Sequence, residues 1–219
     1  MAEKKNDKAA RFADVLDRLA AAYPDARIAL DFRDPYQLLV AVVLSAQCTD
    51  RRVNEVTPAL FSRYPTTCAL AEAERTSLES LIRPCGLFRA KARALTEACR
   101  LLCDRFGGEV PASRADLALL PGLGNKSAGV VSMHLGAAPA LPVDTHVARL
   151  AYRLGLSSSD QPDRIEQDLR ALLPPERWSA AHHLLIAHGR GICLARKPRC
   201  ASCPVLGLCP RRGVRAAPS

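Results

Sequence analysis

Four cysteines close to the C-terminus constrain this chain more than any other feature of its sequence. They have the spacing C-x6-C-x2-C-x5-C, at Cys193, Cys200, Cys203 and Cys209. Four thiols this close together favour a metal site, because thiolates are ligands of both zinc and iron–sulfur clusters. Only Cys200 and Cys203 form a short CxxC pair, whereas four-cysteine zinc sites usually contain two such pairs. The spacing therefore favours an iron–sulfur cluster, and zinc is the alternative.

The other five cysteines are spread along segments with helical apolar spacing. They are Cys48, Cys68, Cys85, Cys99 and Cys103. Free cysteine at such positions packs as a small apolar side chain. Residues 1–11 are charged and lack the apolar segment of a secretory signal, so we expect a cytoplasmic protein without disulfides. The longest apolar run, residues 38–46, is too short to cross a bilayer, and no membrane partner is expected.

Positive charge dominates the chain and is concentrated at its C-terminal end. There are 31 Lys and Arg residues against 22 Asp and Glu, a formal net charge of +9. Residues 177–219 contain no acidic residue at all. A cationic surface of this kind is typical of proteins that bind polyanions, with nucleic acid as the first candidate. A solvated basic surface without a ligand is the alternative.

Apolar residues recur at helical spacing along almost the whole chain. No segment shows the alternation of a half-buried strand, so the predicted fold class is all-α. We expect helices at residues 12–23, 35–44, 51–63, 76–82, 89–106, 114–120, 126–135, 145–154, 162–173 and 176–188.

A glycine turn separates two of these helices, within the sequence Leu119–Ala128. Gly122 and Gly124 permit backbone conformations that other residues avoid, and they leave amide groups uncovered where the second helix begins. Uncovered amides at a helix N-terminus can bind a phosphate oxygen. An ordinary turn between two helices has the same pattern, so the motif alone does not establish DNA binding.

Two candidate catalytic residues lie at predicted helix starts. Lys126 is in the first turn after the glycines, where the helix field favours the neutral amine that a lysine nucleophile needs. Its alternative is a solvated surface lysine. Asp144 lies where a helix N-cap belongs, and capping is its ordinary role. His146 follows it and, taken alone, indicates only a helix histidine.

Together, and in this order, the motifs resemble those of the endonuclease III family. This family comprises bacterial DNA glycosylases and abasic-site lyases of the helix-hairpin-helix superfamily. The resemblance covers about residues 14–210. It is carried by the LSAQCTD segment at 44–50, Gly86-Leu87-Phe88 with Lys91-Ala92, LPGLGNKSA at 120–128, VDTH at 143–146, HGRGICLARKPRC at 188–200, and the four C-terminal cysteines.

The resemblance implies a fold of two helical lobes with a DNA cleft between them. A six-helix barrel with the helix-hairpin-helix motif would span residues 28–138. Residues 1–27 and 139–219 would form a second lobe that carries a [4Fe-4S] cluster. The four C-terminal cysteines would bind this cluster, whose role would be mainly structural.

The resemblance also implies a bifunctional enzyme that excises oxidised pyrimidines, such as thymine glycol, from double-stranded DNA. Lys126 would attack C1′ of the flipped nucleotide and form an imine, and β-elimination would then break the strand on its 3′ side. Asp144 would stabilise the cationic sugar and move protons. The other DNA-binding residues would be Ser45, Gln47, Leu87, Gly122, Gly124 and His146. A monomer in the cytoplasm, associated with the nucleoid, is expected.

Two alternatives keep the same fold. One is a monofunctional mismatch glycosylase, which lacks the lysine that this chain has at residue 126. The other is a non-catalytic or specialised DNA-binding paralogue. It is kept because the chain departs from the family pattern at Cys48, Asn125 and Gly129, where a small residue or threonine, a basic residue and asparagine are usual.

Overall fold

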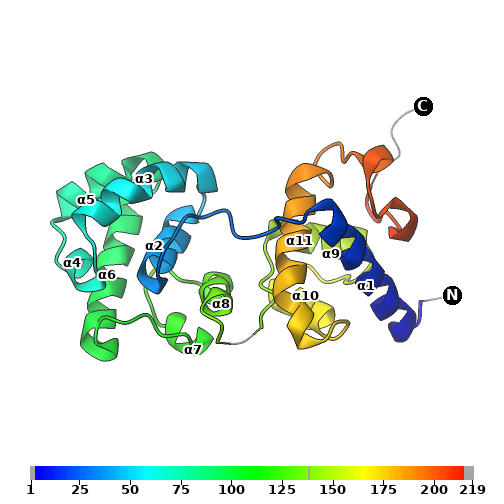
Figure 1. Ribbon diagram of the computed structural model, residues 1–219, viewed down its shortest axis with the longest axis horizontal. Coiled ribbons are helices and arrows are strands. Elements are labelled where there is room, and N and C mark those ends of the chain that lie inside the picture. Colours follow the sequence, from blue (N-terminus) through cyan, green and yellow to red (C-terminus); the bar gives the residue numbers. More distant parts are fainter. Residues whose placement is uncertain (1–2, 138, 215–219) are drawn as a thin grey trace. The chain divides into compact units, whose positions relative to one another are not determined.

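The computed structural model describes residues 3–137 and 139–214 and contains only helices, turns and loops in these ranges. The predicted all-α fold class is therefore confirmed (Figure 1). The α-helices are α1 (Lys5–Ala22), α2 (Pro35–Ser45), α3 (Asp50–Arg63), α4 (Thr67–Ala71), α5 (Arg75–Ile82), α6 (Phe88–Phe106), α7 (Arg114–Leu117), α8 (Asn125–His134), α9 (Thr145–Arg153), α10 (Pro162–Arg170) and α11 (Trp178–Gly191). Short 3-10 turns are η1 (Arg83–Cys85), η2 (Pro175–Arg177), η3 (Cys200–Ser202) and η4 (Leu206–Leu208).

The helix boundaries differ from the sequence expectation in several places, including α1, which begins at Lys5 and not at residue 12, and α10, which ends at Arg170 and not at residue 173. Helix α4 has five residues, which is too short to show a period, and it was not expected. Helix α7 ends at Leu117 because the chain turns there toward the glycines, three residues before the predicted end. Helix α11 begins at Trp178 because the preceding proline-containing segment forms the η2 turn instead.

The chain divides into two compact units, which we call the terminal unit and the central unit. The terminal unit comprises Met1–Ile28 and Pro139–Ser219, and the central unit comprises Ala29–Ala138. Residue 138, at the predicted boundary, lies outside the described residues. No helix in the described ranges is long and apolar enough to cross a membrane.

Helix α2 forms the core of the central unit. Every residue from Leu38 to Leu44 is buried, and the helix packs against α3, α6 and α8. A helix that is apolar on all sides must be buried in this way. It begins where Asp34 accepts a hydrogen bond from the amide of Gln37 at 2.8 Å, and it ends at Ser45, beside the loop that contains Gln47.

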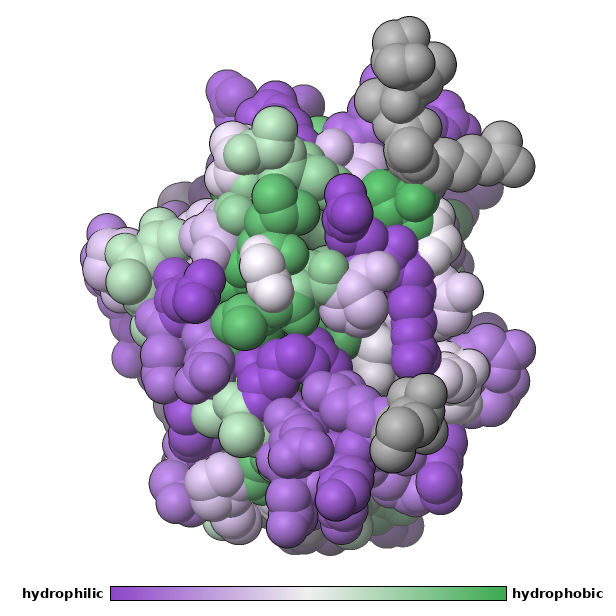
Figure 2. Space-filling view, turned by 90° about the vertical axis from the view of Figure 1, so that its right-hand side faces the viewer, coloured by the Kyte–Doolittle hydropathy of each residue, from purple (hydrophilic) through white to green (hydrophobic). Residues whose placement is uncertain are grey.

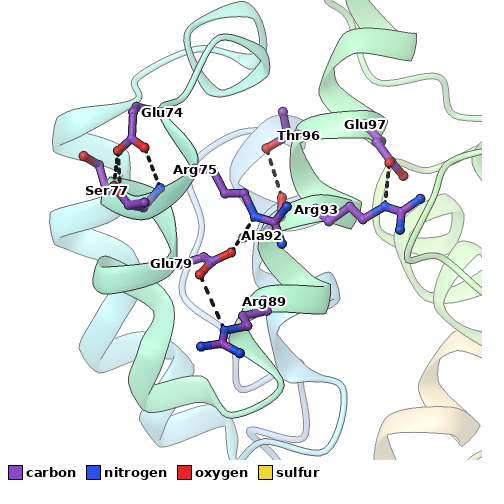
Figure 3. A network of polar contacts seen from close by, with 10 residues as sticks. Glu74, Arg75, Ser77, Glu79, Arg89, Ala92, Arg93, Thr96 and Glu97 are labelled. Carbon is purple, nitrogen blue, oxygen red and sulfur yellow. Dashed lines mark hydrogen bonds and ion pairs between the residues drawn. The ribbon is translucent and has the colours of Figure 1, made fainter.

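Polar contacts fix α5 against the start of α6 (Figure 3). The Glu74 side chain caps α5 by accepting hydrogen bonds from Thr76 and Ser77, and these bonds lower the pKa of Glu74 to about 2. Glu79 then accepts from Arg75 in its own helix at 2.7 Å and pairs with Arg89 of α6 at 3.9 Å. The loop between the two helices, which contains Leu87, is therefore anchored on both sides.

The N-terminal helix and the C-terminal third share the core of the terminal unit. Phe12, Leu16 and Leu19 of α1 are buried with apolar residues of α9, α10 and α11. Figure 2 shows one face of this unit, where apolar side chains gather in one area and hydrophilic side chains surround them. The large apolar side chains that remain exposed in its described part are Tyr152 and Leu206.

The expectation that the chain contains no disulfide is wrong. Cys68 of α4 and Cys103 of α6 are joined, with their Cα atoms 6.0 Å apart. The two residues are 35 positions apart in the sequence, and only the packing of α4 on α6 brings them together. Cys85 and Cys99 are buried free thiols, as expected for small apolar residues, and burial raises the pKa of Cys99 to about 12.

The turn between α7 and α8 depends on Gly122. Its φ of +86° is a conformation that L side chains rarely adopt, and an added Cβ would lie 3.0 Å from Cβ of Ala94. Leu120 and Leu123 on either side are buried, so the turn is held against the core. Gly124, in contrast, has a φ of −79° and nothing within 4 Å of an added Cβ.

We predict that Gly122→Ala lowers the free energy of unfolding by about 1–3 kcal/mol, because it combines backbone strain with a steric clash. Gly124→Ala is the matched control and should cost less than about 1 kcal/mol. Chemical denaturation of both variants measures the difference. Equal stability of the two variants would contradict this account of the turn.

Candidate functional site

Lys126 is exposed in the first turn of α8, directly after the glycine turn. The N-cap of α8 is Gly124, which has no side chain to cap the amides of the first turn. The geometry thus places an accessible amine beside the positive end of a helix. An anion at this end would be stabilised by the same field.

Asn125 positions a guanidinium group at the same helix start. Its side-chain oxygen accepts a hydrogen bond from Nε of Arg114 at 3.1 Å. The sequence has asparagine where its family resemblance leads one to expect a basic residue, and the structure brings a basic residue from α7 to that position. Gly129, the second departure, is buried inside α8.

Asp144 is the N-cap of α9, as the sequence predicts. Its Oδ1 accepts hydrogen bonds from the amides of His146 and Val147, both at 2.8 Å. No hydrogen bond to Oδ2 is present among the residues that the structure describes. One carboxylate oxygen therefore fixes the helix start, and the half-buried group keeps a second oxygen for another task.

His146 is held in one orientation by α11 and by Arg149. A guanidinium group only donates hydrogen bonds, so Nδ1 of His146 accepts from Nη2 of Arg149 at 3.1 Å. The imidazole packs over Gly189, where an added Cβ would lie 2.9 Å from Nδ1. The neutral ring thus has its proton on Nε2, which is available as a donor.

Gln47 and Leu87 lie in two loops of the central unit and share an unusual backbone conformation. Their φ angles are +52° and +47°, and both side chains are exposed, Leu87 by 58%. Such angles cost about 1–2 kcal/mol in a residue other than glycine. Ser45, before the first loop, donates its hydroxyl to the carbonyl of Val42 and is half-buried.

Lys91 joins these two loops, a role that its motif in the sequence does not predict. Its side chain is 5% exposed, and Nζ donates to the carbonyls of Leu44 at 2.9 Å and Cys85 at 2.8 Å. Burial lowers the pKa of this amine. One signal could have revealed it, because Lys91 lies on the same helical face as the buried Leu95 and Ala98.

The four C-terminal cysteines come together in the terminal unit. They are half-buried free thiols and line one small cavity with apolar neighbours that include Leu150 and Val205. Among the described residues no three His, Cys, Asp or Glu side chains are placed to hold a single metal ion. The cysteines instead surround a space, as ligands of a polynuclear cluster must do.

The electrostatics of this cavity also suit a cluster. Burial raises the pKa values of Cys203 and Cys209, and the neighbouring cysteines raise them further. These two thiols therefore need a nearby cationic centre to be deprotonated, and the iron of a cluster would supply one. The donor set and its surroundings fit an iron–sulfur cluster.

Arg153 forms several hydrogen bonds with the start of residues 193–209, which contain the four cysteines and which we call the cysteine segment. The residue is 8% exposed, and its guanidinium donates to Sγ of Cys193 at 3.2 Å and to the carbonyls of Leu194 at 2.7 Å and Ala195 at 3.0 Å. Arg149, one turn earlier, donates to the carbonyl of Cys193 at 3.1 Å. A guanidinium group suits this task because its donors form a rigid planar fork.

Helix α9 therefore links two groups of predicted site residues within the terminal unit. Asp144 and His146 lie at its N-terminal end, and Arg149 and Arg153 hold the cysteine segment along its length. In the central unit, the structure places Gln47 and Leu87 in two loops joined by Lys91, with Ser45 at the end of the helix before the first loop. It places Gly122, Gly124 and Lys126 together in the turn before α8 and its first residues.

Two family models match the parts of the chain that carry these features. A family model described as HhH-GPD superfamily base excision DNA repair protein matches residues 40–175. The model of the iron–sulfur binding domain of endonuclease III matches residues 193–209, the segment bounded by the first and last of the four cysteines. Endonuclease III of Synechocystis sp. is 48% identical over 211 residues, which are 96% of this chain and 94% of that protein.

Two solved structures of endonuclease III with DNA resemble this chain closely. A non-covalent complex has a TM-score of 0.88 and 44% identity, and the match covers 93% of this chain and 95% of that one. A trapped covalent intermediate has the same TM-score and identity, with 93% and 96% covered.

We predict that Lys91→Met loosens both loops of the central unit. The variant keeps the length of the side chain but leaves two carbonyls without their donor, at a cost of about 1–3 kcal/mol for each carbonyl left buried. Hydrogen exchange followed by mass spectrometry should show faster exchange at residues 45–49 and 86–88. Lys5→Met, at an exposed position of α1, is the control. Unchanged exchange in Lys91→Met would show that Lys91 does not tie the loops.

We predict that Arg153→Lys weakens the cysteine segment, because a single amine cannot replace the planar fork. The purified protein should contain less iron per chain, and its unfolding temperature should fall by about 4–10 °C. Arg164→Lys, in an exposed ion pair of α10, should change neither quantity measurably. Full iron content and wild-type stability in Arg153→Lys would contradict the role given to this residue.

Proposed function

Since this chain belongs to the endonuclease III family, we propose that it removes oxidised pyrimidines, such as thymine glycol, from double-stranded DNA. It is a base excision repair enzyme with DNA glycosylase and abasic-site lyase activities. The observation that carries the proposal is the accessible amine of Lys126 at an anion-binding helix start. A monofunctional glycosylase would not need this amine.

The chemistry assigned to Lys126 is a substitution at C1′ of the damaged nucleotide. The amine bonds to C1′, the bond between C1′ and the base breaks, and the base leaves with the bonding electrons and takes up a proton. Loss of the remaining amine proton and ring opening give an imine. Removal of a proton from C2′ then breaks the C3′–O bond, which cuts the strand on the 3′ side.

Asp144 supplies negative charge to the same reaction. As the base leaves, positive charge develops on the sugar, and a carboxylate lowers the energy of that state. The same group can accept a proton from the attacking amine and return it later. Its N-cap bonds, which use only Oδ1, hold the carboxylate in place while this happens.

The remaining site residues are assigned to DNA binding. The amides at Gly122 and Gly124 bind backbone phosphate, which gives affinity without sequence preference. Arg114, held by Asn125, adds a cation there in place of the usual basic residue. Gln47 and Leu87 fill the gap that the flipped nucleotide leaves, and His146 donates from Nε2.

The [4Fe-4S] cluster is a structural cofactor in this proposal. Its ligands are Cys193, Cys200, Cys203 and Cys209. Arg153 of α9 bonds to the first of these cysteines, and Asp144 is the N-cap of the same helix, so the cluster would stabilise the helix that positions the carboxylate. It supplies no group to the reaction. We propose a monomer that acts at the nucleoid in the cytoplasm, because one chain carries the lysine, the carboxylate and the phosphate-binding turn.

The experiment is strand cleavage and base release on a duplex with one thymine glycol. Lys126→Ala should abolish strand cleavage at this lesion and at an abasic site. Asp144→Asn keeps a good N-cap but removes the charge, and base release should fall about 100–1,000-fold. Asp34→Asn, at the N-cap of α2, makes the same change away from the site and should leave the rate unchanged.

Strand cleavage by Lys126→Ala at the wild-type rate would overturn the proposed nucleophile. Wild-type base release by Asp144→Asn would overturn the role of the carboxylate. Wild-type protein that is active on an abasic site but not on thymine glycol would limit the failure to the substrate class.

A further inference from the structure

Tyr23 and His188 form a hydrogen-bonded chain that ends on one of the four cysteines. Tyr23 is the C-cap residue of α1, and its hydroxyl lies 3.0 Å from Nδ1 of His188. Nε2 of the same imidazole lies 3.5 Å from Sγ of Cys203. The two rings meet edge to face, with their centroids 5.8 Å apart. All three residues belong to the terminal unit.

The direction of the hydrogen bonds follows from the chemistry of the sulfur. A cysteine bound to iron is a thiolate and has no proton to donate, so the hydrogen between Nε2 and Sγ belongs to Nε2. A neutral imidazole has one N–H group, and Nδ1 is then an acceptor. The Tyr23 hydroxyl must therefore donate to it.

Burial makes this orientation depend on Tyr23. The His188 side chain is 2% exposed, so bulk water does not replace a lost partner at Nδ1. Burial and the nearby thiols raise the pKa of Tyr23, which keeps its hydroxyl protonated as a donor. The Tyr23 hydroxyl draws electron density from the ring at Nδ1 and so strengthens Nε2–H as a donor, and without it the hydrogen bond to the thiolate is weaker.

We propose that Tyr23 is a positioning residue that, through His188, fixes the hydrogen bond to Cys203 and so sets the reduction potential of the cluster. Hydrogen bonds to cluster sulfurs withdraw electron density and raise the potential, and outer partners of ligands are known to orient them. The inference rests on the proposed role of Cys203 as a cluster ligand. It assigns α1 a task in the cluster environment beyond its packing in the core.

The hydrogen bond from His188 to Cys203 depends on Tyr23, and the bonds to two of the other sulfurs do not. Cys193 accepts from Arg153 of α9, and Cys209 accepts from the amide of Arg211 at 3.4 Å. Both donors are independent of Tyr23. The change in potential on removal of the Tyr23 hydroxyl therefore reports the bond to Cys203.

The test is Tyr23→Phe in the cluster-loaded full chain. We expect wild-type iron content and a midpoint potential, measured by protein-film voltammetry, that moves to more negative values. In resonance Raman spectra, the shift of the Fe–S(Cys) stretching bands on exchange into D2O should shrink, because the N–H···S bond is weaker. Tyr152→Phe removes a phenol from α9 of the same unit and should change neither measurement.

His188→Gln provides a second arm, since an amide can donate to the sulfur without help from Tyr23. In that background, Tyr23→Phe should cause no further change in potential. An equal change in both backgrounds, an unchanged potential in Tyr23→Phe, or loss of the cluster in that variant would each overturn the inference. Cys203→Ser tests the ligand assignment separately, because retention of the unaltered cluster absorbance would contradict that assignment alone.

Discussion

The bonds between Arg153 and the cysteine segment are the interaction on which the terminal unit depends. A buried guanidinium is costly unless its donors find acceptors. Here they find four, which are Sγ of Cys193 and the carbonyls of the consecutive residues Cys193 to Ala195. Within the described ranges, no carboxylate pairs with this guanidinium. Because Arg153 and Asp144 belong to the same nine-residue helix and its cap, the cysteine segment and the carboxylate are held by one rigid element.

In the central unit, a buried lysine likewise donates hydrogen bonds to backbone carbonyls. Lys91 satisfies the carbonyls at the ends of α2 and η1, where the helix ladder leaves them without a partner. The adjoining loops contain the two strained residues, Gln47 and Leu87. Strain of this kind persists only where the surroundings hold it, and a buried cation bonded on both sides provides that support. The exposed side chains of Gln47 and Leu87, which we propose contact DNA, are thus held on a fixed backbone.

Motifs that act locally could be predicted from the sequence, and long-range partners could not. Asp144 as an N-cap, the glycine turn and the cysteine spacing each depend on a few neighbouring residues. The Cys68–Cys103 disulfide, the bond from Arg114 to Asn125 and the burial of Lys91 depend on which helices pack together. Two of these contacts leave a local trace in the sequence. For the disulfide it is the short capped segment that forms α4, and for Lys91 it is a lysine on an apolar helical face. Neither trace identifies the partner of the residue.

The most direct test of the account is borohydride trapping on a duplex with one thymine glycol, followed by peptide mapping of the reduced product. The amine of Lys126 is exposed at its helix start, and the proposed imine is the species that borohydride reduces. The account predicts a covalent protein–DNA product in which the sugar remnant is attached to the peptide that contains Lys126. Attachment to another residue, or no covalent product under conditions where the protein cuts the strand, would contradict it.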